Sequence, residues 1–221
     1  MTRPGTVVGI HTGGRVEVAV QRGDAAASDG TDRQALEGVL PLVRRCLEEL
    51  QTDVASIEAV AACCGPGSFT GLRIGVAFAK SLAQALDVPA IGVSAFDVEA
   101  ALREEDTQAA PAVVVVEGKR EFYYARIYSR ASRSDFLSVA GTRDEIAAAA
   151  RDSLGEASGA AAAAQAIRGS VRAIGSRARA VVKLGTEAIA AGAAADWRSL
   201  AIDYGQRPNA VVNWERRHGR T

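Results

Sequence analysis

Histidine and cysteine, on which many catalytic and metal centres depend, are scarce in this sequence. The 221 residues include two histidines, His11 and His218, and three cysteines, Cys46, Cys63 and Cys64. The histidines lie near opposite ends of the chain, and the cysteines show no C-x-x-C spacing. This composition argues against a zinc site and against a Ser/His/Asp or Cys/His centre. We expect no catalytic residue and no metal ligand, and we interpret the cysteines as small core residues in a reducing compartment.

Long apolar runs and an excess of charge of one sign are also missing. No segment reaches the length that a membrane-spanning helix needs, and the first residues do not resemble a signal peptide. The 26 basic residues balance 26 acidic residues, so the formal net charge is zero. A free-standing protein that binds nucleic acid with high affinity needs a basic surface that releases counterions. The balanced charge argues against that class, and we expect a cytoplasmic protein without a membrane partner.

The densest local pattern lies in residues 57–86. The short apolar run Val60–Cys63 predicts a strand buried on both faces, and the turn at residues 65–67 ends it. Ser68 or Thr70 then provides a hydroxyl that caps a following helix. The loop lacks the lysine of a P-loop, and its spacing G-x-G-x-x-x-G differs from the dinucleotide fingerprint G-x-G-x-x-G. Two interpretations stay open: an anion site at the helix N-terminus, and a tight turn without a ligand.

The helix predicted from Leu72 to Leu86 is apolar or small nearly all round. Its long polar side chains share one narrow stripe, and its small residues form a ridge spaced by four. The stripe consists of Arg73, Lys80 and Gln84, and the ridge of Gly71, Gly75, Ala79 and Ala83. Such a helix must be buried on nearly all sides. Either its own domain covers both faces, or a partner protein covers one of them.

The segment GPGSFTGLRIGVAFAKSLAQAL, followed by VPAIGVSAFD, resembles the signature segment of the TsaB (YeaZ) family. Members of that family are non-catalytic subunits of the bacterial complex that transfers threonylcarbamoyl to the adenosine next to the tRNA anticodon. Near the C-terminus, Tyr204 and Arg207 match a family segment that ties the edge of the fold. The family-signature loop consists of Gly65, Pro66, Gly67, Ser68, Phe69, Thr70 and Gly71.

Through this resemblance the chain is expected to have the α/β fold of the actin-like ATPase superfamily. The resemblance implies two RNase H-like domains with mixed sheets flanked by helices: residues 1–108 with the partner-binding helices, and a smaller domain over residues 109–221. The residue pattern adds an amphipathic helix from Ala35 to Leu50, with Pro41 inside it. Residues 24–33 give only a weak signal for a strand, and residues 155–164 are left open between a helix and a loose linker. Strands are predicted at 7–10, 16–20, 60–63, 90–93, 113–116, 122–128, 136–139 and 171–174.

His11 marks a departure from the family pattern. The family typically reads I-D-T-S where this chain reads Ile10-His11-Thr12-Gly13, and in catalytic members of the superfamily an acidic residue there helps to position a metal. Imidazole is a poor ligand for magnesium. We therefore expect no ATP hydrolysis and no cofactor of the chain's own. His11 is either a base, a ligand for another metal, or a simple strand-end histidine.

The resemblance also implies partners. TsaB proteins pair with their catalytic paralogue TsaD through the first two helices of each N-terminal domain, and the ATPase helper TsaE joins the assembly. The resemblance implies that this chain contacts tRNA only through that complex. A homodimer through the same helices is left open. If these helices form the interface, a Gly75→Leu change abolishes pairing and leaves the monomer folded. The partner-binding residues are expected to be Leu36, Val39, Leu40, Val43, Leu47, Gly71, Leu72, Gly75 and Ala79.

Two alternatives belong to other classes of protein. A stand-alone actin-like ATPase or kinase predicts magnesium-dependent ATP turnover by the pure protein. A homodimeric structural protein predicts self-association through the same two helices, without any tRNA modification. The residues favour the subunit of a tRNA threonylcarbamoyltransferase complex, which is not an enzyme by itself.

Overall fold

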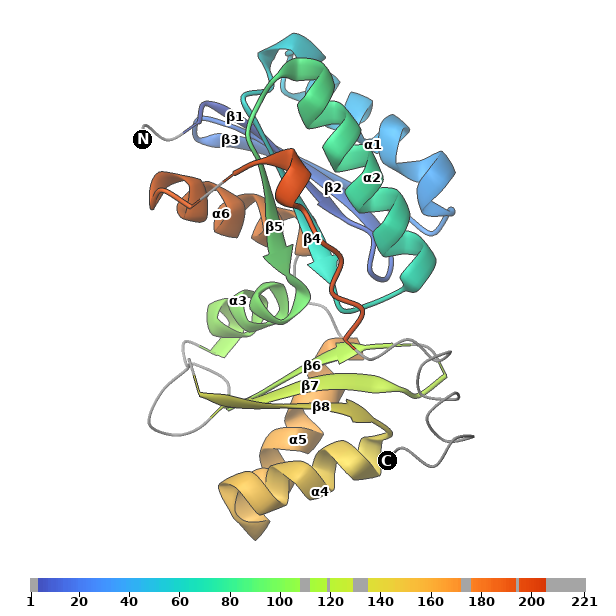
Figure 1. Cartoon of the computed structure of the whole chain (residues 1–221), viewed down its shortest axis with the longest axis vertical. Helices are drawn as coiled ribbons and strands as arrows, with labels where there is room; N and C mark the ends of the chain where they lie inside the picture. Colours follow the sequence, from blue (N-terminus) through green and yellow to red (C-terminus); the bar gives the residue numbers. More distant parts are fainter. Residues whose placement is uncertain are drawn as a thin grey trace.

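The computed structural model describes residues 4–107, 112–118, 120–128, 135–171, 176–193 and 195–205. They form a sheet of five strands and a sheet of three strands, one above the other along the long axis of the molecule, with helices packed on both (Figure 1). The strands are β1 (Thr6–His11), β2 (Val16–Arg22), β3 (Ala25–Thr31), β4 (Ala59–Gly65), β5 (Ala90–Ser94), β6 (Val113–Glu117), β7 (Tyr123–Tyr128) and β8 (Phe136–Gly141). The α-helices are α1 (Ala35–Glu49), α2 (Phe69–Leu86), α3 (Ala95–Thr107), α4 (Arg143–Leu154), α5 (Glu156–Val171) and α6 (Arg177–Ala190), and the short 3₁₀ turns are η1 (Val54–Ser56) and η2 (Trp197–Ser199). No helix in the described ranges has both the length and the hydrophobicity needed to cross a bilayer.

The five-stranded sheet has the order β3-β2-β1-β4-β5 and is covered on both faces. β1, β2 and β3 are antiparallel neighbours, whereas β4 and β5 run parallel to β1. Successive side chains of a strand point to opposite faces. Val8 and Ile10 of β1 therefore share a core with residues of α1 and α2, and Val7 shares the other core with residues of α3 and α6. Figure 1 shows α1 and α2 on one side of this sheet and α6 on the other. The mixed α/β architecture that was expected is confirmed.

Strand β3 and helix α1, which pack together at one edge of this sheet, can be compared with their sequence predictions. The polar segment 24–33 contains β3, which pairs with β2 over its whole length. Its ladder of backbone hydrogen bonds, rather than an apolar pattern, defines this strand. Helix α1 keeps the predicted range to within one residue, and Pro41 lies inside it on the exposed side.

The three-stranded sheet has the order β6-β7-β8 and is antiparallel. Tyr123 and Ile127 of β7 share a core with residues of α4 and α5. The segment 155–164, left open by its sequence, belongs to helix α5 from its second residue on. Val171, where a strand is predicted to begin, is instead the last residue of α5, and residues 172–174 of that predicted strand lie outside the described residues. A Cβ at Gly159 would overlap the carbonyl oxygen of Ala150 in α4, so the small residues of α5 permit close contact between the two helices.

Helix α6 follows the second sheet in the sequence but packs on the first. A Cβ at Gly9 of β1 would lie 2.5 Å from Val182 Cγ2 of α6, which shows how closely the helix approaches the sheet. Residues 195–205, called the strap below, then pass over β4, β5 and α2 (Figure 1). The segment 109–221 therefore contributes a helix and the strap to the five-stranded sheet.

Candidate functional site

The family-signature loop joins β4 to α2 and packs against the β1–β2 turn. The peptide bond between Gly65 and Pro66 is cis, and Gly67 has a φ of 156°. Ser68 is the N-cap of α2, with its Oγ accepting a hydrogen bond from Gly71 N at 3.4 Å. Ser68 N donates to Gly13 O at 2.7 Å. The hydroxyl cap predicted for the start of this helix is confirmed at Ser68.

The small-residue ridge of α2 also contacts the β1–β2 turn, so it is used inside the chain. A Cβ at Gly71 would overlap the carbonyl oxygen of Thr12, and a Cβ at Gly75 would overlap the Oγ1 of Thr12. Thr12 is buried, and its Oγ1 has no hydrogen-bond partner among the described residues. The expectation that Gly75→Leu leaves the monomer folded stays a prediction, and the contact argues against it because Thr12 already occupies the space beside the ridge.

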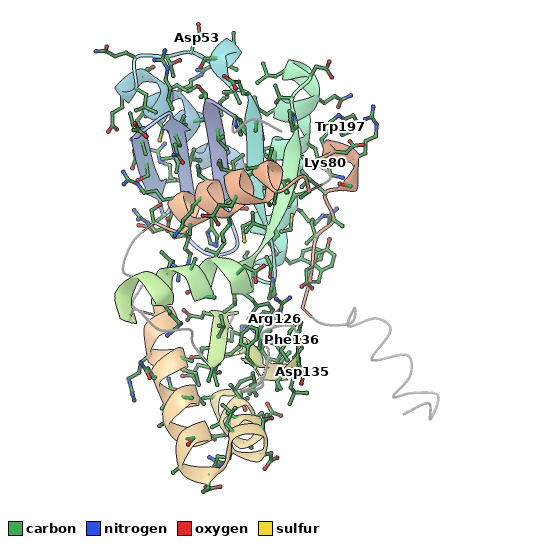
Figure 2. All side chains as sticks on the ribbon, turned by 90° about the vertical axis from the view of Figure 1, so that its left-hand side faces the viewer. Asp53, Lys80, Arg126, Asp135, Phe136 and Trp197 are labelled. Carbon is green, nitrogen blue, oxygen red and sulfur yellow. The ribbon has the colours of Figure 1, made fainter. Side chains whose placement is uncertain are left out.

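The strap closes over the signature loop from the other side. Asp203 N donates to Cys64 O at 2.8 Å, and a Cβ at Gly205 would lie 2.7 Å from Pro66 Cβ. The ring of Tyr204 stacks on Phe69 with centroids 5.0 Å apart. Figure 2 shows Trp197 of η2 beside Lys80, where the strap crosses α2. The tie predicted at Tyr204 is present; Arg207 lies outside the described residues.

The outer surface of α1 and α2 exposes apolar side chains. Leu36 is 76% exposed and Leu40 is 44% exposed, one helical turn apart on α1. On α2, Ile74 and Phe78 are half-buried. We call these four side chains the α1–α2 surface. Six of the residues expected to bind a partner are instead buried within the chain: Val39, Val43, Leu47, Leu72, Gly75 and Ala79.

A cleft of about 340 Å³ separates the N-termini of α1 and α2. Its lining includes Arg33, Gln34 and Ala35 before and at the start of α1, and Ser68 and Thr70 at the start of α2. The side chain of Gln34, the N-cap of α1, makes no cap hydrogen bond to its helix. The first N–H groups of a helix have no partner within it and can bind an anion. The anion site considered from the sequence stays a prediction, and this cleft is the place to test it.

His11 ends β1 in a buried position, with an exposed fraction of 5%. Its Nδ1 lies 3.4 Å from Arg15 O, and its strand neighbour is Glu17 of β2. Burial and, next, the positive charge of Arg177 lower the pKa of His11 from 6.5 to about 4, although Glu17 opposes the shift. A neutral imidazole beside a guanidinium does not fit the magnesium position that the fold superfamily implies. Among the described residues, no group of three or more His, Cys, Asp and Glu side chains is placed to hold a metal ion.

The lowered pKa of His11 predicts an acid-sensitive fold. Between the folded pKa of about 4 and the unfolded value of 6.5, the unfolded chain binds a proton that the folded chain does not. Stability is therefore complete above the unfolded pKa and falls as the pH drops toward the folded value. We expect the free energy of unfolding to fall by about 2 kcal/mol more in the wild type than in His11→Gln between about pH 7 and about pH 5. Urea unfolding at both pH values measures this difference, and equal losses in the two proteins would contradict it.

The chain is similar to known proteins in sequence and in fold. The sequence model of the family described as "TsaD: tRNA N6-adenosine threonylcarbamoyltransferase" matches residues 29–199. A tRNA N6-adenosine threonylcarbamoyltransferase of Salinibacter ruber is 46% identical over 56 residues, which are 25% of this chain and 17% of that protein. The tRNA threonylcarbamoyladenosine biosynthesis protein TsaB of Haemophilus influenzae is 32% identical over 99 residues, 44% of this chain and 42% of that protein. The aligned segments thus span less than half the length of these relatives.

A solved structure, YeaZ from Pseudomonas aeruginosa, shares the fold. It superposes with a TM-score of 0.65 over 90% of this chain and 99% of that chain. The two sequences are 20% identical, so the likeness concerns the fold.

Proposed function

This chain belongs to the TsaD/TsaB (YeaZ) family, and we propose that it is a non-catalytic subunit of a complex that adds threonylcarbamoyl to adenosine in tRNA. Its partner in this proposal is the catalytic tRNA N6-adenosine threonylcarbamoyltransferase, TsaD. The chain itself contributes a binding surface that orders the catalytic subunit. It needs no cofactor of its own, and it reaches tRNA only through the complex.

The observation that carries this proposal is the α1–α2 surface. Leu36 and Leu40 lie on one face of α1 and remain exposed in the isolated chain. Adjacent exposed apolar side chains on neighbouring helices are typical of a protein interface. Helix α2 lies beside α1 on the same face of the sheet, and Arg73, Ala77 and Ser81 on its outer side are also exposed (Figure 1). A helix pair of the catalytic subunit fits this surface better than a small molecule does.

The surroundings of His11 support a binding role over a stand-alone ATPase or kinase. A phosphate–magnesium group at the β1–β2 turn would meet the buried, neutral His11 where a carboxylate is the preferred metal ligand. The turn itself is filled on its other side by Gly71 and Gly75 of α2, which pack on Thr12. Both observations favour a β1–β2 turn that holds α2 in place over one that binds phosphates.

A reconstituted modification assay tests this function. Purified TsaD from the same source is incubated with threonylcarbamoyl-adenylate and unmodified tRNA, with and without this chain. We expect modified adenosine only when both proteins are present, and none with this chain alone. Modification that does not depend on the chain would contradict the proposal. Magnesium-dependent ATP turnover by the chain alone would favour the stand-alone enzyme instead.

A further inference from the structure

A cavity of about 300 Å³ lies where β2, β3 and the start of α6 meet. Its lining is polar or glycine throughout and consists of Arg15, Glu17, Ser28, Asp29, Gly30 and Ser176. One water molecule takes about 30 Å³ in the liquid, and small-molecule pockets begin at about 300 Å³. The cavity therefore has room for a small polar molecule rather than for a single water.

Glu17 of β2 brings a buried carboxylate to this cavity. The residue is 7% exposed, and it lies on the same face of the sheet as Ala19, which shares a core with residues of α6. Ser176, the N-cap of α6, donates from Oγ to Glu17 Oε2 at 3.0 Å. No salt bridge joins Glu17 to another of the described residues. A buried charge is costly unless an opposite charge pairs with it, so this carboxylate favours a positive group in the cavity.

The positive groups around Glu17 are hydrogen-bonded to other residues: Arg177 to Glu99, Arg15 to Asp32 and Arg179 to Ser28. The strand neighbour His11 is neutral at pH 7, since its pKa is about 4. Asp29, the other acidic residue of the lining, pairs with Arg45 at 2.9 Å. Glu17 is therefore the carboxylate of this lining that has no charged partner within the described part of the chain.

Gly30 of β3 lies between the two charged side chains that line the cavity. A Cβ at Gly30 would lie 3.0 Å from Arg15 Nη1 and 3.2 Å from Glu17 Cγ. The guanidinium and the carboxylate side chain thus approach the same point of the wall without a salt bridge between them. The cavity presents a positive and a negative group within the reach of one small molecule.

We propose that this cavity binds a small zwitterion, whose ammonium group contacts Glu17 and whose carboxylate contacts Arg15. The ammonium supplies the countercharge that the buried Glu17 lacks, through a charge-assisted hydrogen bond. Arg15 can exchange Asp32 for the ligand at little cost, because the Asp32 side chain is 91% exposed and an exposed ion pair contributes little.

Two other occupants fit the cavity less well. A hard metal cation takes about six oxygen ligands, and the described residues bring no three His, Cys, Asp or Glu side chains together. A simple anion would meet the unpaired charge of Glu17. The cavity opens on the α6 face of the sheet, opposite to the face that α1 covers, so this inference does not rest on the proposed pairing with a partner.

Titration of the isotope-labelled full-length chain, followed by amide chemical shifts in NMR, tests the site. The zwitterionic probes are glycine, β-alanine and 4-aminobutyrate, which hold their two charges at three separations. Propylammonium and propionate carry one charge each and serve as matched compounds. We expect at least one zwitterion to shift the amide signals of Gly30 and Ser176, and to bind at least about tenfold more tightly than either singly charged compound.

Two variants remove the features that define the site. Glu17→Gln removes the charge but keeps the size of the side chain and an oxygen that accepts from Ser176, and it is expected to weaken zwitterion binding at least about tenfold. Gly30→Ala adds the Cβ that would crowd Arg15 and Glu17, and it is expected to abolish the shifts while every charge is kept. Gly14→Ala in the β1–β2 turn is the matched control, because a Cβ there meets no atom within 4 Å, and it is expected to bind like the wild type.

The two variants are independent, so a failure of one to fold leaves the other to decide. Equal affinity of the wild type and a folded Glu17→Gln or Gly30→Ala protein would overturn the site. The absence of a shift at Gly30 and Ser176 with all three zwitterions would overturn it as well. Propylammonium that binds as tightly as the zwitterions would rule out the contact with Arg15 and with it the zwitterion.

Discussion

Gly75→Leu is expected to lower the free energy of unfolding by at least about 3 kcal/mol, the upper part of the range for an overpacked core. The added side chain would start inside the volume of Thr12, because a Cβ at this position would overlap Thr12 Oγ1 and lie 3.0 Å from Thr12 Cγ2. Thr12 cannot retreat easily, because its carbonyl oxygen is packed against Gly71 one turn earlier. Domains of this size are only marginally stable, so this loss removes a large part of the total.

The measurement for Gly75→Leu is urea unfolding followed by circular dichroism. Ala77→Leu is the matched control, since Ala77 is exposed on the outer side of the same helix. Its stability is expected to stay within about 0.5 kcal/mol of the wild type. A Gly75→Leu protein as stable as the wild type, but unable to bind a partner, would instead support a ridge that serves a helix crossing between proteins.

Replacing both Leu36 and Leu40 with aspartate is expected to weaken binding to the proposed catalytic partner at least about thirtyfold. This factor corresponds to about 2 kcal/mol for an apolar anchor buried at an interface centre. The free chain is expected to remain folded, because both side chains are exposed and Leu36 lies in the first turn of α1, where an acidic residue is favourable. Binding is measured by titration calorimetry with purified TsaD.

Val54→Asp is the control for the surface charge that this double change introduces. Val54 is 39% exposed and lies on η1, which follows the C-terminal end of α1, whereas Leu36 and Leu40 lie in the N-terminal half of that helix. Its affinity for the partner is expected to equal that of the wild type. If the two leucine replacements bind TsaD as tightly as this control, the α1–α2 surface is not the interface.

The signature loop and its helix show what local sequence patterns predict well. The strand before the loop, the hydroxyl cap at Ser68 and the helix to Leu86 all follow from such patterns, and the structure contains each of them. The ridge of α2 is harder to interpret, because spacing shows that small residues share a face but not what that face contacts. Its contact, Thr12, lies far away in the sequence. The same limit applies to Val39 and Val43, which cover the sheet and leave the surface to Leu36 and Leu40.

The remaining features depend on contacts between distant segments. A buried ion pair joins Glu99 of α3 to Arg177 of α6 across 78 positions of the sequence. The Ser176 hydroxyl donates a hydrogen bond to Glu17 across 159 positions, so no local pattern indicates either contact. β3 is polar and is defined by its ladder with β2. Helix α6 carries an ordinary amphipathic pattern, and nothing in that pattern tells which of the two sheets it covers.

Size-exclusion chromatography with light scattering tests the proposed pairing with TsaD most directly. The chain is measured alone, TsaD from the same source is measured alone, and the two are then mixed in equal amounts. We predict that both free species disappear into a complex with the summed mass of one copy of each, and that a homodimer of this chain, where present, dissociates to form it. Two proteins that elute at their separate positions at every concentration tested would contradict the proposed pairing.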